Sequence, residues 1–155
     1  MAALTWARTT PMHQDDGSSQ VMTPEVQDGV VIWTGAIVVL DGGKAAPARS
    51  AVGLTVLGVA RDTVDNRTFP TDLYGHMRRV SVVSGVAQYE NSRATDEITG
   101  ADVGHTCFLV DDRTLARTDG GGKRSPAGTV HEVGHDRRVW VDLGGRPVHA
   151  ELVRR

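Results

Sequence analysis

The sequence predicts a mainly β protein, a small antiparallel β-barrel or sandwich with one short helix and an extended N-terminal arm. Short apolar runs rich in valine recur along the chain, such as "VVIW" at 30–33 and "AIVVL" at 36–40, which is typical of strands. Clusters of Gly, Pro, Asn and Asp separate these runs and supply turns. The chain has 18 glycines and many valines, a composition that favours short strands joined by tight turns over packed helices.

We divide the 155 residues into an arm, residues 1–24, and a single β-rich domain, residues 25–155. The arm is polar and irregular, so we expect it to be mobile on a free monomer. Leu4, Trp6 and Met12 are its apolar exceptions. Two interpretations of Trp6 stay open: its ring packs on its own domain, or the arm lies on a partner.

The domain begins after Pro24, where short valine-rich apolar runs replace the polar sequence of the arm. We expect a bulge or bend at Gly85, inside a long strand-like stretch. Residues 92–104 predict the helix, with Thr95 as its cap, Ile98 and Val103 facing inward and Gly104 ending it. Residues 144–155 form either a last short strand or a tail. The expected strands lie at 30–33, 36–40, 52–64, 77–89, 106–112, 127–133 and 137–143.

The stretch "HEVGH" at 131–135 has the His-Glu-x-x-His pattern of zinc peptidases. That chemistry needs a helix, in which the two histidines share one face. Valines flank the motif and Gly134 interrupts it, which disfavours a helix. "GHD" at 134–136 instead separates two strand-like runs, as in a hairpin. We therefore expect extended backbone that folds back on itself and no zinc peptidase, although incidental metal binding by His131 and His135 stays open.

Other sequence motifs for catalysis or ligand binding are incomplete. The loop "DDRTLARTDGGG" at 111–122 lacks the EF-hand order, so we interpret it as a flexible acidic loop. "TDGGGKRS" lacks the spacing of a phosphate-binding loop, and no Gly-x-Ser-x-Gly elbow is present. We expect no enzyme, and we assign no catalytic, cofactor-binding or metal-binding residue.

Composition excludes further classes. Cys107 is the only cysteine, so a disulfide within one chain is excluded and we expect a buried thiol. The net charge of −2 gives no basic surface for direct contact with nucleic acid. We find no signal-peptide pattern and no apolar run long enough to cross a membrane.

Residues 28–145 resemble the small capsid cement or decoration proteins of tailed-phage heads. The segments that carry the resemblance follow one another in a family-like order, and the most specific is "DVGHTCFLVDDRTLARTDGGGKRSPAG" at 102–128. The chain departs from the family pattern in "HEVGHDRRVWV", where histidines replace an acidic or glycine turn. The other segments are "TGAIVVLDGGKAAPA", "GLTVLGVARDTVDN", "SGVAQYEN" and "VWVDLGG".

The resemblance implies a viral structural protein without catalytic residues or cofactors. Such a protein is made in the host cytoplasm, binds the outer surface of the phage head, contacts the major capsid protein and often forms a homotrimer on the shell. Neither nucleic acid nor membrane is a direct partner. A head–tail connector or a tail structural protein is the alternative within the virion.

Apolar anchors on a cement protein would contact the shell, and aromatic residues dominate such contacts. The candidates for this partner interface are Leu4, Trp6, Met12 and Trp33. We predict that removal of residues 1–20 leaves a folded domain that decorates shells poorly.

Overall fold

The computed structural model describes residues 3–12, 21–68 and 77–143. The chain is mainly β and contains a closed barrel, which confirms the predicted fold class. Within the described residues, no helix is long and apolar enough to cross a membrane. The strands are β1 (Val21–Met22), β2 (Val31–Ile32), β3 (Ile37–Asp41), β4 (Lys44–Pro47), β5 (Thr55–Ala60), β6 (Val64–Asp65), β7 (Val82–Val83), β8 (Gly85–Asn91), β9 (Thr106–Leu109), β10 (Thr114–Ala116), β11 (Pro126–Val133) and β12 (Val139–Leu143).

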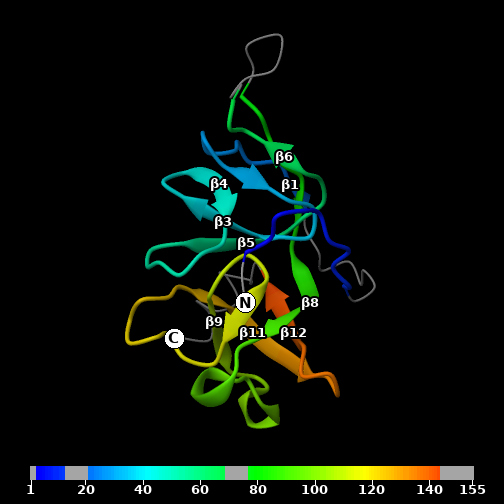
Figure 1. Cartoon of the computed structure of the whole chain (residues 1–155), viewed down its shortest axis with the longest axis vertical. Coiled ribbons are helices and arrows are strands. Elements are labelled where there is room, and N and C mark those ends of the chain that lie inside the picture. The colour runs from blue at the N-terminus through cyan, green and yellow to red at the C-terminus, as the bar shows by residue number, and fades with distance from the viewer. Residues whose placement is uncertain (1–2, 13–20, 69–76, 144–155) are drawn as a thin grey trace, which may run out of the picture.

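The strands form three units that are stacked along the long axis of the molecule (Figure 1). The barrel has the strand order β10-β8-β12-β11-β9 and closes on itself through the β9–β10 pair. A five-stranded sheet of order β1-β7-β5-β3-β4, here called the middle sheet, lies on the barrel. The two-stranded ribbon β2–β6 lies at the far end of the molecule.

Strand β3 of the middle sheet is buried on both faces over its first three residues, which explains the apolar run at 36–40. Ile37 and Val39 of β3 join the barrel strands in one hydrophobic core. Val38 points the other way and packs with Ile32 and Val64 of the ribbon in a second core. Because successive side chains of a strand alternate between faces, a strand between two cores must be apolar at every position.

The barrel strands, in contrast, alternate between interior and solvent. Val139, Val141 and Leu143 of β12 are fully buried, whereas Trp140 and Asp142 between them are partly exposed. Cys107 is buried in the same core, as predicted. One barrel pair is parallel, β8 with β10, because the chain crosses the end of the barrel between β8 and β9.

The predicted helix at 92–104 is present as two single 3-10 turns, Ala94–Asp96 and Gly100–Asp102. Thr99 caps the second turn, and Thr95 caps neither. The Asn91 side chain accepts a bond from Ile98 N at 2.9 Å and donates to Ile98 O at 2.8 Å, so a continuous helix cannot form. Ile98 is buried as predicted, but the prediction for Val103 is wrong because its side chain is exposed.

The predicted strand at 77–89 is divided between two units. β7 belongs to the middle sheet and β8 to the barrel, and the predicted bend at Gly85 is where the chain passes from one to the other. The prediction of a flexible acidic loop at 111–122 is wrong at its start, because Asp112 is buried and β10 begins two residues later. The predicted last strand or tail at 144–155 falls outside the described residues.

Candidate docking surface

The "HEVGH" stretch is strand and turn, as predicted. His131 and Glu132 belong to β11, which pairs with β12 through Glu132 opposite Trp140 and Val133 opposite Val139. The register shifts between Val130 and Glu132, so a bulge lies at this point of the strand. In the part of the chain that the structure describes, no group of three His, Cys, Asp or Glu side chains could hold a metal ion.

Residues 3–12 are seated on the domain. Arg8 N donates to Thr34 O at 2.8 Å, and Gln88 N donates to Pro11 O at 2.9 Å. Met12 forms an antiparallel bridge with Ala87. Because β10 pairs only with the last two residues of β8, this segment covers the remaining part of the same strand edge.

Asp112 fixes the start of the segment to the domain. Its carboxylate Oδ1 accepts a hydrogen bond of 2.8 Å from Leu4 N, and its carbonyl oxygen accepts one of 2.9 Å from Ile37 N. The Asp112 side chain is only 2% exposed, and Leu4 is 8% exposed. Burial raises the pKa of Asp112 to about 6, and the neighbouring Asp111 acts in the same direction, against the Leu4 hydrogen bond.

We expect Asp112 to make the protein less stable as the pH rises. A carboxyl group whose folded-state pKa is raised from 3.8 to about 6 contributes full stability below pH 4, and this contribution is lost as the pH rises through 6. In Asp112→Asn the amide oxygen still accepts from Leu4 N but does not ionise. Between pH 4 and pH 7.5 the variant should therefore gain about 2 kcal/mol in unfolding free energy relative to the wild type.

Urea unfolding at several pH values measures this difference. Asp111→Asn is the graded comparison, because Asp111 is less buried but its charge helps to raise the pKa of Asp112. Its pH dependence should lie between those of the wild type and Asp112→Asn. Parallel pH curves for Asp112→Asn and the wild type would contradict the expected role of Asp112.

Arg8 and Tyr89 hold the middle of the segment. The Arg8 guanidinium lies 5.0 Å from the centre of the Tyr89 ring, and its Nη2 donates to Gln88 O at 3.3 Å. The buried Tyr89 hydroxyl donates to Gly35 O at 2.5 Å, and Thr10 Oγ1 donates to the same oxygen at 2.7 Å. Burial raises the pKa of Tyr89, which therefore stays neutral and acts as a donor.

Gly35 has to be glycine because the segment passes directly over it. A Cβ at this position would overlap the Arg8 side chain and backbone and approach Thr10 Oγ1 to 2.6 Å. Any side chain at position 35 would therefore displace the segment.

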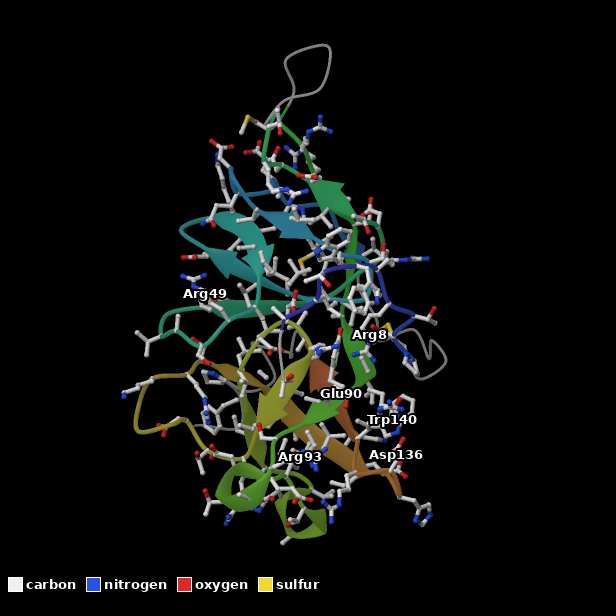
Figure 2. The ribbon with its side chains drawn as sticks, in the orientation of Figure 1. Arg8, Arg49, Glu90, Arg93, Asp136 and Trp140 are labelled. Carbon is white, nitrogen blue, oxygen red and sulfur yellow. The ribbon has the colours of Figure 1, made fainter. Side chains whose placement is uncertain are left out.

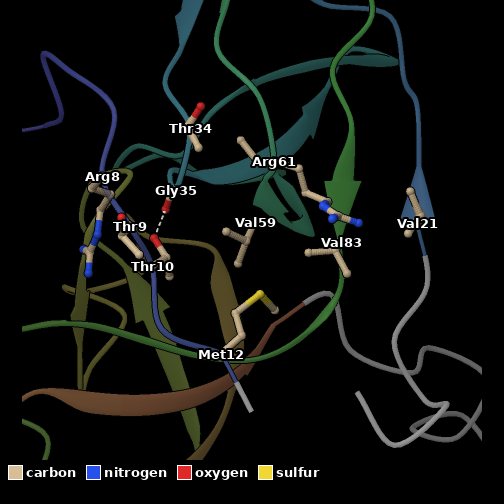
Figure 3. A pocket seen from close by; sticks show the side chains of 11 residues that line it. Arg8, Thr9, Thr10, Met12, Val21, Thr34, Gly35, Val59, Arg61 and Val83 are labelled. Atoms are coloured by element: carbon tan, nitrogen blue, oxygen red, sulfur yellow. Dashed lines mark hydrogen bonds between the residues drawn. The ribbon is translucent and has the colours of Figure 1, made fainter. Parts of the chain in front are cut away.

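A groove of about 530 Å³ opens between this segment and the middle sheet (Figure 3). Its walls carry Met12, Val59 and Val83, whose side chains gather at the centre of the view. The charged residues that line it are both arginines, Arg8 and Arg61. The complete lining is Arg8, Thr9, Thr10, Met12, Val21, Thr34, Gly35, Val59, Ala60, Arg61 and Val83.

The predicted interface residues fall in different environments. Leu4 is part of the interior, whereas Trp6 is 66% exposed on the seated segment. Met12 lines the groove. Trp33 is half-buried in the chain just before Thr34, the acceptor for Arg8 N.

The sequence did not single out Arg61, Val59 or Val83 as site residues. Each lies in an ordinary strand-like run, and only the pairing of β5 with β7 brings them to one groove. Asp112 lies in a stretch that we interpreted as a flexible acidic loop, and its partner Leu4 is 108 positions away.

Arginine side chains are spread over the whole molecule (Figure 2). Arg8 lies near the middle of the molecule, while Arg93 lies lower in the view, near the 3-10 turns. Arg61 and Arg93 are both exposed, and neither forms an ion pair with another described residue. They are therefore a matched pair for testing the groove.

The fold and the groove define a small β-barrel protein with a preformed apolar surface groove. In comparisons with protein-family models, curated proteins and solved structures, nothing matches this chain.

Proposed function

We propose that this protein is a capsid cement protein that binds the outer surface of a phage head and bridges major capsid subunits as a trimer. The resemblance of residues 102–128 to that family supports the proposal, and this segment forms a continuous part of the barrel from the second 3-10 turn to β11. The observation that carries it is Trp6, a large aromatic side chain that is 66% exposed on a backbone that is hydrogen-bonded to the domain.

An anchor that is fixed before binding favours tight attachment. Backbone bonds at Leu4 and Arg8 enclose Trp6 on both sides in the sequence. Ordering a loose tail on a partner costs conformational entropy, and a seated segment has already lost most of it. Trp is also among the residues that contribute most to protein interfaces. When several such contacts form on one shell, each bound contact raises the effective concentration for the next, so the overall affinity increases.

Binding of purified protein to bare, expanded phage shells tests this function. At protein concentrations below saturation, Trp6→Ala should lower shell occupancy about tenfold, because loss of an aromatic anchor costs at least one factor of ten in affinity. Val52→Ser is the control, since Val52 is also 66% exposed but lies in the turn before β5. Its occupancy should equal that of the wild type.

Imaging of the same particles locates the bound protein. Density distributed over the outer shell supports a cement protein, whereas density confined to the head–tail junction or the tail would support the connector or tail alternative. Wild-type protein that does not bind shells would contradict the proposal, as would equal occupancy for Trp6→Ala and the wild type.

A further inference from the structure

We propose that the groove between residues 8–12 and the middle sheet binds an extended segment of a protein partner in which a carboxylate lies next to an apolar side chain. The identity of the partner as the shell subunit rests on the proposed function. The chemistry of the segment rests on the residues of the groove alone.

The apolar part of the groove is a row of three valines across three strands. Val21 of β1 lies opposite Val83 of β7, and Val83 lies opposite Val59 of β5. Val59 is buried and Val83 partly so, but Val21 is 59% exposed. Met12 closes the row on the side of the N-terminal segment. Val21 is therefore the exposed end of the row, and an exposed apolar side chain in a preformed groove marks a site of association.

The charges of the groove select an acidic partner. Both charged lining residues are positive. The Arg8 guanidinium lies over the Tyr89 ring and points away from the valines (Figure 3), so Arg61 supplies the charge that a partner in the groove would meet. The exposed Arg61 forms no ion pair with any residue that the structure describes, and the adjacent Asp62 accepts a hydrogen bond of 3.0 Å from Ser81 N. A guanidinium at the rim of an apolar groove binds a carboxylate strongly, since it offers paired donors and is weakly hydrated.

The groove is preformed on both sides. The middle sheet fixes one wall through the pairing of β5 and β7. The bond from Thr10 Oγ1 to Gly35 O fixes the other, as the dashed line in Figure 3 shows. A partner segment therefore does not have to order the groove, which lowers the entropy cost of binding.

Charge reversal at Arg61 tests the proposal on bare shells. Arg61→Glu should weaken binding about tenfold or more, and Arg61→Lys should fall between Arg61→Glu and the wild type because it keeps the charge but loses the paired donors. Val21→Ser should weaken binding severalfold. The controls are Arg93→Glu and Val52→Ser, an exposed arginine without an ion pair to a described residue and an exposed valine elsewhere. Both should bind like the wild type, and all variants should unfold at the wild-type urea midpoint.

The outcomes separate this proposal from the proposed function. If the wild type binds shells and Arg61→Glu binds equally well, the groove proposal is wrong and the cement function stands. If the wild type does not bind shells, both are wrong. In images of decorated shells, a coat-protein segment in the groove supports the proposal. A second copy of this protein in the groove, or residues 13–20 of the same chain, would overturn it.

Discussion

Gly58→Ala is expected to lower the free energy of unfolding by about 3–5 kcal/mol. Gly58 has φ +145°, which L side chains rarely adopt. A Cβ there would also overlap the carbonyl oxygen of Val83 and lie 2.7 Å from its carbonyl carbon. Val83 cannot move away, because β7 is paired with β1 on its other side. Relief would therefore require β5 and β7 to separate next to the valine row of the groove.

Urea unfolding measures the loss of unfolding free energy. Gly53→Ala is the comparison that separates the effect of atomic overlap from the effect of backbone strain. Gly53 has φ +79°, but a Cβ there meets nothing within 4 Å. That variant should lose about 1 kcal/mol from backbone strain alone. Equal losses for the two variants would mean that close packing of β5 on β7 contributes nothing at Gly58.

Leu4→Ala is expected to lower the free energy of unfolding by about 2 kcal/mol and to weaken shell binding as well. Leu4 is 8% exposed, so its truncation removes buried contacts that keep the segment in place. Trp6 lies two positions further along but is 66% exposed. Trp6→Ala should therefore leave stability within about 0.5 kcal/mol of the wild type.

Leu4→Ala tests the packing of the N-terminal segment on the domain, and Trp6→Ala tests its exposed aromatic side chain. Leu4→Ala should also speed hydrogen exchange at Gln88 N, which donates to Pro11 O in the seated segment. Trp6→Ala should leave that exchange rate unchanged. If Leu4→Ala unfolds at the wild-type urea concentration, the contact of Leu4 with the domain does not contribute to stability.

These expectations change the prediction that we made for removal of residues 1–20. The sequence predicts a mobile arm whose removal leaves a folded domain. Its contacts were not predictable, since Leu4, Arg8 and Pro11 meet residues that are far away in the sequence. A truncated protein should bind shells poorly and also be less stable, so a stability measurement must accompany the binding assay.

Local patterns were enough to predict the hairpin and not the stacking of the sheets. β11 and β12 are adjacent in the sequence, and the alternation at 139–143 defines which side chains face inward. The apolar run at 36–40 predicted a buried strand, but it did not predict that the strand contributes side chains to two separate cores. The 92–104 stretch suited a helix, yet the Asn91 side chain holds its centre extended.

The candidate site was predictable only where a single residue was conspicuous. Trp6 and Met12 were selected as apolar residues in a polar arm, and both are at or beside the proposed surface. Arg61 had no such signal among the 17 basic residues of the chain. Its role depends on the register of β1, β7 and β5, which sequence patterns do not determine.

The N-terminal segment, residues 3–12, also covers a strand edge that could otherwise pair with another copy of the protein. Residues 11–12 occupy the edge of β8 that β10 leaves open, through the Met12–Ala87 bridge and the Gln88–Pro11 bond. An uncovered strand edge is a template for pairing with another chain. Variants that release the segment should therefore aggregate increasingly as the protein concentration rises.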